Sequence, residues 1–179
     1  ERLETGELTR EQVMLGRFHE FFESEGLPTD QVKEFNDEYQ IRLGDKAFFC
    51  DHGDELVKQL KSAVKQYAVT NGTTVAQERK LRLSGLDQLL DGVFISEQVG
   101  VDKPQKAFFD AVWNEIGSYA PDEIVIVGDS LTSDIRGGKN AGILTCWYNP
   151  DHLPNKIGVT PDCTIDNLQD ILSYLDESR

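Results

Sequence analysis

IVIVGDSLTSDIRGGKNAG, residues 124–142, is the stretch that decides the fold. Its four leading apolar residues predict a strand that is covered on both faces, as strands of parallel sheets are. The strand runs into Gly128 and Asp129, and a second acid, Asp134, follows five residues after the first. The segment from Leu131 onward predicts a helix. A strand, a polar turn and a helix in this order are typical of an α/β fold.

The chain on either side of this stretch continues the alternation. Strands are predicted at QYAVT, GVFIS, ILTCWY and CTI, and helices at GDELVKQLKSAVK, ERKLRLSGLDQLL, PQKAFFDAVWNEIG and NLQDILSYL. Pro104 suits the first position of its helix, because its missing N–H would have no partner there. Alternating strands and helices predict an α/β fold built on a mostly parallel, doubly wound sheet.

Residues 1–47 have a different pattern, which is helical throughout. Thr9 and Gln12 are placed as a capping box, in which each side chain satisfies a free backbone donor of the other residue. The segment EGLP, residues 25–28, separates this helix from a second one at TDQVKEFNDEYQIRL. We therefore expect a small helical cap over residues 1–47 and an α/β core over residues 48–179.

Composition excludes several classes of protein. The 179 residues carry a formal net charge of −14, which repels phosphate backbones, so neither a nucleic-acid polymer nor an anionic membrane is expected as a partner. No apolar run approaches the ~20 residues that span a bilayer. Cys50, Cys146 and Cys163 are widely spaced and form no CxxC pair. They predict reduced thiols in a cytoplasmic protein, and no zinc site.

Polar side chains stand at or just beyond the ends of three predicted strands. Thr70 ends the first, and Lys103 follows the second by a short loop. Asp129 ends the third, with Asp134 close behind it. Ligands of open parallel sheets bind beyond the carboxyl ends of the strands. We therefore expect these four side chains to converge on one pocket.

The two acids, Asp129 and Asp134, are expected to share a metal ion. Two carboxylates about 4 Å apart repel by roughly 1 kcal/mol in water and by ~4 kcal/mol at an effective dielectric of 20. Without a cation, one of them would tend to take up a proton. Mg²⁺ resolves the conflict, since it takes one or two carboxylates together with water and substrate phosphate. The alternative for this motif alone is a turn whose polar residues only cap the helix.

The other two segments are suited to binding phosphate. The hydroxyl of Thr70 and the backbone N–H groups of Asn71 and Gly72 can donate to phosphate oxygens, although Asn-Gly is also a common turn pair. Lys103 can neutralise a phosphoryl group and the acids around it, although a lysine before a helix is often simply solvated. The combination of a hydroxyl, a lysine and an acid pair at separate strand ends favours a site.

This combination resembles the haloacid dehalogenase superfamily of phosphohydrolases. VTNG is similar to its second motif, VDKP to its third and VGDSLTSD to its fourth. TREQVMLGRF, ISEQVGVDKP and GDSLTSDIRGGKNAGILTCWYNP resemble its pyrimidine 5′-nucleotidase branch. The resemblance implies a Rossmann-like core with a helical cap. It also implies a Mg²⁺-dependent phosphomonoester hydrolase that acts on nucleoside 5′-monophosphates through an aspartyl-phosphate.

The resemblance also implies a role for each residue at the strand ends. Thr70 would bind a phosphate oxygen, with Asn71 and Gly72 beside it. Lys103 would bind phosphate too, and would stabilise the nucleophile and the phosphoryl group. Asp129 and Asp134 would hold Mg²⁺. Thr70, Lys103 and Asp129 are the predicted catalytic residues.

The superfamily's first motif, DxDxT after a strand, does not occur in the 179 residues. Its two aspartates would be the nucleophile and the general acid. We therefore expect them upstream, with roughly 50–60 further residues, on a strand between those that end at Thr70 and Asp129. The core of residues 48–179 would then lack its first strand, and the cap of residues 1–47 would be partial. Residues 1–179 alone are expected to be inactive.

Two other functions stay open at this point. One is a phosphatase for another small phosphate ester, such as phosphoglycolate or a sugar phosphate. The other is a non-catalytic module of the same fold that binds phosphate. The preferred base, the sugar and the oligomeric state stay open as well.

Overall fold

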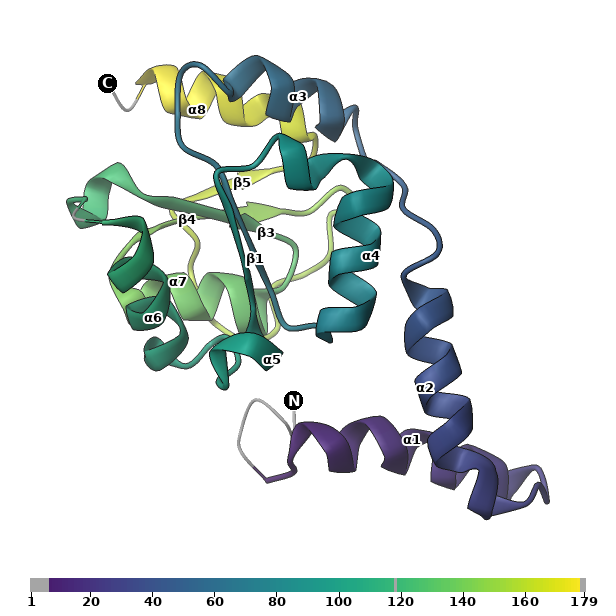
Figure 1. Cartoon of the computed structure of the whole chain (residues 1–179). Coiled ribbons are helices and arrows are strands. Elements are labelled where there is room, and N and C mark those ends of the chain that lie inside the picture. Colours follow the sequence, from purple (N-terminus) through teal and green to yellow (C-terminus); the bar gives the residue numbers. More distant parts are fainter. Residues whose placement is uncertain (1–6, 118, 178–179) are drawn as a thin grey trace.

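The computed structural model describes residues 7–117 and 119–177. It shows an α/β core with a helical segment that extends away from it (Figure 1). No helix in these described ranges is both long and apolar enough to cross a membrane.

The helical segment consists of α1 (Arg10–Ser24), the 3-10 turn η1 (Thr29–Gln31) and α2 (Val32–Leu43). The predicted capping box is confirmed. The hydroxyl of Thr9 accepts a hydrogen bond from the Gln12 N–H, and the Gln12 side chain accepts one from the Thr9 N–H. From residue 7 to residue 47 the described chain contains no strand. The division into a cap and a core stays a prediction.

The core alternates strands with helices along the chain. Its strands are β1 (Tyr67–Thr70), β2 (Gly92–Ile95), β3 (Val125–Gly128), β4 (Leu144–Tyr148) and β5 (Cys163–Ile165). Its α-helices are α3 (Gly53–Leu60), α4 (Thr74–Ser84), α5 (Ser96–Val99), α6 (Lys106–Ile116), α7 (Arg136–Ala141) and α8 (Ile171–Glu177). Short helical turns complete it: η2 (Leu86–Gln88), η3 (Pro121–Glu123), η4 (Leu131–Ile135) and η5 (Leu168–Asp170). The predicted α/β fold class is confirmed.

All strand pairs are parallel, and within the described ranges the strands form two sheets. β1 pairs with β2, and the second sheet has the order β3-β4-β5. In this part of the chain, β1 and β3 are each paired along one edge and not with each other. A strand between them, which the sequence leads us to expect, stays a prediction.

Helices cover the sheets from two sides, as a doubly wound fold requires. In Figure 1, α3 and α8 lie on one side of the sheets and α6 and α7 on the other. The α6 side is a cluster that draws on both sheets: Phe108, Phe109, Val112, Ile126 and Ile143, with Val69 and Phe94 packed against it. The α3 and α8 side is a second cluster: Leu56, Cys146, Ile165 and Ile171. Side chains of α6, β1, β2 and β3 thus share one apolar cluster, which extends over both sheets.

The prediction that β3 is covered on both faces is wrong for the described residues. Ile126 is 7% exposed, but Val127, which points to the opposite face, is 39% exposed. The α6 cluster covers the Ile126 face, whereas Val127 is in neither of the core clusters that the described residues form.

Two helix boundaries also differ from the prediction. α6 begins at Lys106, so Pro104 lies in the loop before it rather than at the first helical position. The side-chain amide of Asn140 donates to the Pro104 carbonyl at 3.0 Å and helps to hold that loop. The helix predicted from residue 53 ends at Leu60. The amino group of the next residue, Lys61, donates to the carbonyls of Gln88 and Leu89.

Candidate active site

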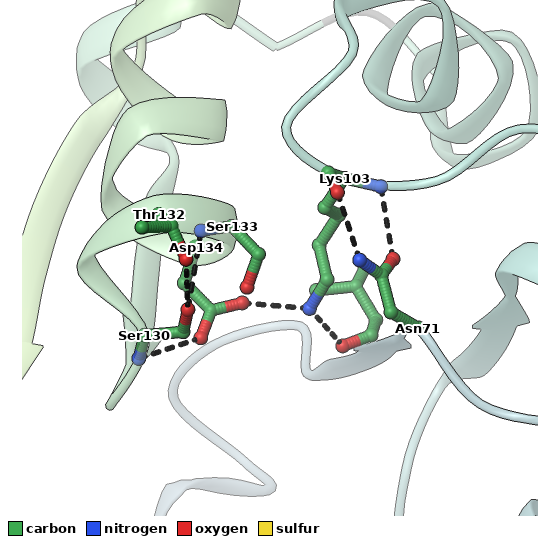
Figure 2. Close-up of polar contacts among 7 residues, drawn as sticks. Asn71, Lys103, Ser130, Thr132, Ser133 and Asp134 are labelled. Atoms are coloured by element: carbon green, nitrogen blue, oxygen red, sulfur yellow. Dashed lines mark hydrogen bonds and ion pairs between the residues drawn. The ribbon is translucent and has the colours of Figure 1, made fainter. Parts of the chain in front are cut away.

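Lys103 is the centre of a buried polar cluster at the carboxyl ends of the strands (Figure 2). The residue is 5% exposed. Its Nζ donates to the Val69 carbonyl at 2.8 Å and to Asp134 Oδ1 at 2.7 Å. Val69 belongs to β1, Lys103 follows β2, and Asp134 follows β3. The lysine therefore links the ends of three strands and bridges the two sheets.

Asn71 fixes the loop that carries Lys103. Its Nδ2 donates to the Lys103 carbonyl at 2.8 Å, and its Oδ1 accepts from the Lys103 N–H at 2.8 Å. Both ends of the amide are thus used within the protein, as Figure 2 shows. These bonds fix the orientation of the side-chain amide, and the backbone N–H of Asn71 takes no part in them. The predicted phosphate contacts at Asn71 and Gly72 stay predictions for backbone groups.

Asp134 is held by Lys103 on one side and by the turn after β3 on the other. The residue is 7% exposed, and its Oδ2 accepts from the Ser130 N–H at 3.2 Å. Ser130 caps η4, since its hydroxyl accepts from the Ser133 N–H at 3.1 Å. The carboxylate lies over Gly128, where a Cβ would come within 2.4 Å of Asp134 Oδ2. A glycine at this position is what gives the carboxylate room.

Thr70 and Asp129 are the other two residues that the sequence predicts at the strand ends. The Asp129 side chain is exposed, while its backbone carbonyl accepts from the Trp147 indole at 3.0 Å. Thr70 is half-buried and is the last residue of β1, directly after the carbonyl that Lys103 contacts. The structure thus places Lys103 against Asp134 and leaves Asp129 open to solvent. The catalytic and metal-binding roles of all four stay predictions.

The donors present fit a single Mg²⁺. In the described ranges, no cluster of three or more His, Cys, Asp or Glu side chains gathers, but Mg²⁺ commonly uses one or two carboxylates and completes its shell with water and phosphate. Asp129 offers an exposed carboxylate. Each oxygen of Asp134 accepts one N–H and has a second lone pair available. Asp129 and Asp134 would hold the ion.

Sequence reasoning missed an arginine beside this cluster. The Arg10 guanidinium donates to the Gly72 carbonyl at 3.1 Å, contacts the Ser96 hydroxyl and pairs with the Asp102 carboxylate. Arg10 and Asp102 lie inside TREQVMLGRF and ISEQVGVDKP, two of the segments that carried the resemblance. Their pairing could not be read from the sequence, because 92 positions separate them.

A family model described as haloacid dehalogenase-like hydrolase matches residues 4–142 of this chain. YfnB, a HAD-hydrolase of Bacillus subtilis, is 34% identical and covers 96% of this chain and 73% of its own. The pyrimidine 5′-nucleotidase PynA of Streptococcus pneumoniae is 34% identical, over 98% of this chain and 74% of PynA. The pyrimidine 5′-nucleotidase YjjG of Escherichia coli is 30% identical, over 96% of this chain and 75% of YjjG.

The fold also matches a solved structure. The crystal structure of YfnB bound to magnesium superposes with a TM-score of 0.91, covering 98% of this chain and 76% of that one, at 34% identity. That structure is described as revealing an interdomain movement. The match extends over the helical segment and the core of this chain alike, because it covers nearly all of it.

Proposed function

The chain belongs to the haloacid dehalogenase-like hydrolases. On that premise we propose that it is part of a Mg²⁺-dependent phosphatase that hydrolyses nucleoside 5′-monophosphates. The family match and the relatives confirm the predicted family and the enzyme class, a phosphomonoester hydrolase. The nucleotide substrate, the metal and the aspartyl-phosphate step are proposals. Two relatives that are named as pyrimidine 5′-nucleotidases support the nucleotide.

The buried Lys103–Asp134 pair is the observation that carries this proposal. Side chains of the two residues are 7% and 10% exposed. Burying two charges costs free energy that their attraction often does not return. The pair also lies where ligands of parallel sheets bind, beyond the carboxyl ends of the strands. A charged pair in this position is suited to chemistry on a charged group.

The geometry indicates how Lys103 would meet a phosphate ester. An ammonium group has three N–H donors, and the Val69 carbonyl and Asp134 take two of them. The third is left for an oxygen of the phosphoryl group. The hydroxyl of Thr70 would donate to another oxygen. The Lys103 amino group is already fixed by the fold, and preorganised donors stabilise charge in a transition state without having to reorient.

The remaining steps follow from the family resemblance. An aspartate of a DxDxT segment would attack phosphorus, the bond to the leaving oxygen would break, and a second aspartate would protonate that oxygen. Water would then hydrolyse the aspartyl-phosphate. When bound by Asp129 and Asp134, Mg²⁺ would offset the charge of the phosphate. The 179 residues contain no DxDxT, so the contribution proposed for this chain is to bind and orient the phosphoryl group.

Phosphate release tests the proposal, in a protein where a DxDxT segment accompanies these residues. Nucleoside 5′-monophosphates, phosphoglycolate and sugar phosphates are compared, each with Mg²⁺ and with a chelator. We expect turnover of nucleotides that requires Mg²⁺ and is lost in Lys103→Ala. A clear preference for the other esters would replace the nucleotide proposal with the second phosphatase function. Phosphate binding with no turnover of any ester would indicate the non-catalytic module.

A further inference from the structure

Arg10 is a residue of α1 that contacts the core. Its side chain is 20% exposed and that of Asp102 is 11% exposed. One arm of the guanidinium donates to the Gly72 carbonyl at 3.1 Å, and the other reaches the Ser96 hydroxyl and the Asp102 carboxylate. These three acceptors follow β1 and β2 at their carboxyl ends. A single residue of the helical segment thus ties together loops of the core.

The loops that Arg10 contacts are the ones that carry the predicted site. Gly72 comes two residues after Thr70, and Asp102 directly precedes Lys103. The same two loops are also joined by the Asn71 amide, which bonds both backbone groups of Lys103. The Lys103 loop is therefore held by contacts inside the core and also by one that comes from α1.

The contact with Arg10 matters because Asp102 is a buried carboxylate. The residue is 8% exposed, and Ser96 beside it is 1% exposed. A carboxylate that is buried without a cation is strongly unfavourable. If α1 moved away, Asp102 would have to reach water or lose its charge. The loop that ends at Lys103 would then lose one of the contacts that hold it, while the Asn71 amide would still bond the Lys103 backbone.

The helical segment has a second attachment at its other end. Gln40 of α2 accepts from the Thr73 hydroxyl at 2.9 Å, and Asp45 pairs with Arg79 of α4. In Figure 1, α1 lies beneath α5 and α2 extends beside α4. The Arg79–Asp45 pair is open to solvent, with side chains 44% and 45% exposed. It attaches the segment to the core without contacting the loop of Lys103.

We propose that Arg10 is a positioning residue, whose pair with Asp102 couples the placement of α1 to the placement of Lys103. When the pair is formed, the helical segment is held against the site and the lysine loop is fixed. When the segment moves away at this end, the loop loses this contact and the position of Lys103 becomes less restricted. The coupling itself follows from the contacts, and its effect on catalysis rests on the proposed function.

The first test is hydrogen exchange of the intact 179-residue chain, followed by mass spectrometry. We expect Arg10→Ala to speed exchange of amides in residues 96–105 by about tenfold or more, which is the loss of roughly one charged pair from a local opening equilibrium. Asp102→Asn should do the same without leaving a buried charge. Arg79→Ala, the matched control, should change these amides by less than about twofold, as exposed substitutions usually do.

Arg10→Lys is the conservative variant. It keeps a cation beside Asp102 but lacks the second arm that reaches the Gly72 carbonyl, because lysine has no planar fork. We expect exchange near residues 96–105 to stay close to that of the unchanged chain, while residues 71–73 exchange faster. Circular dichroism checks that each variant is folded. If Arg10→Ala does not fold, the exchange rates of Asp102→Asn test the proposal. Unchanged exchange in Asp102→Asn, or an equal rise in Arg79→Ala, would overturn the proposal.

The second test is kinetic and uses the protein with a DxDxT segment. Misplacing a catalytic group costs turnover more than substrate binding. We therefore expect Arg10→Ala to lower kcat by about tenfold or more with KM changed less, and Arg79→Ala to leave both near their original values. Equal losses in the two variants would overturn the positioning role. Absence of any phosphatase activity, with the exchange pattern intact, would reject the proposed function and leave the coupling standing.

Discussion

Replacing Lys103 with methionine removes one charge from the buried pair while keeping most of the side-chain volume. Asp134 would then be a carboxylate 7% exposed, with the Ser130 N–H as a remaining donor. The Val69 carbonyl would also lose its bond to Nζ. Removing one partner of a buried pair typically costs about 3–5 kcal/mol. Since domains are stable by only ~5–15 kcal/mol, the free energy of unfolding of Lys103→Met should fall by a large fraction.

The double variant Lys103→Met, Asp134→Leu gives the sharper prediction. It removes both charges at once, so no buried charge is left without a partner. Apolar replacements of buried ion pairs are often neutral or stabilising. We therefore expect the double variant to recover most of the stability that Lys103→Met loses, while the site loses its lysine and one of its acids. The double variant would then be more stable than Lys103→Met, although its site would lack both charged residues.

Urea unfolding followed by the fluorescence of the two tryptophans measures both variants. Lys106→Met is the matched control, because Lys106 pairs with Asp110 in an exposed i,i+4 arrangement with side chains 63% and 56% exposed. The control should change the free energy of unfolding by less than about 0.5 kcal/mol. The reasoning would be refuted if Lys103→Met matched the control, or if the double variant were less stable than the single one.

Three further predictions concern single positions. The hydrogen bond from the Tyr148 hydroxyl to the Asp51 carboxylate raises the pKa of Tyr148 from its ordinary value of 10.0 to about 12. The folded state therefore holds this proton more tightly, so the stabilisation is present below pH 10 and is lost as the pH rises towards 12. In a titration followed by tyrosinate absorbance, one tyrosine should ionise near pH 12, and Tyr148→Phe should remove that step. Cys50 is exposed while burial raises the pKa of the Cys146 thiol, so a thiol reagent should modify Cys50 quickly and Cys146 only after unfolding. Gly128→Ala would place a Cβ 2.4 Å from the carboxylate that lies over it, and we expect a loss of about 1–3 kcal/mol in urea unfolding together with weaker phosphate binding.

Local signals in the sequence are sufficient to place the strand ends of this fold. β1 ends at Thr70, as predicted, and β3 ends at Gly128, one residue before the predicted Asp129, because each apolar run stops at or next to a turn-forming residue. Burial was harder to predict. The apolar run of β3 indicated cover on both faces, yet Val127 is 39% exposed. A run of apolar residues shows that both faces of a strand can be buried. Whether each face is buried depends on the elements that pack against it.

The candidate site was predictable in its residue types and less so in its contacts. Lys103 and Asp134 were predicted to meet, and they lie 2.7 Å apart. The Asn71 backbone N–H was expected to bind phosphate, which stays a prediction, and the contact of the Asn71 side-chain amide with the backbone of Lys103 was not foreseen. Arg10 gave no signal at all. Its partners lie 62 to 92 residues away, and side-chain pairs at that separation follow from tertiary packing, which periodicity does not encode.

Lys103 has a structural and a proposed chemical role at once, and its geometry makes the two compatible. Two of its N–H groups bind the Val69 carbonyl and Asp134. Val69 lies in the β1-β2 sheet, and Asp134 lies in η4, which follows a strand of the other sheet. An ammonium has three donors, so one can turn to a phosphate without breaking either contact. Binding would then need little reorganisation, which lowers its cost. An apolar pair could join the two sheets equally well, but it could not stabilise a phosphoryl group. The charged pair therefore makes physical sense as part of a site, where it offers a fixed donor to an incoming anion.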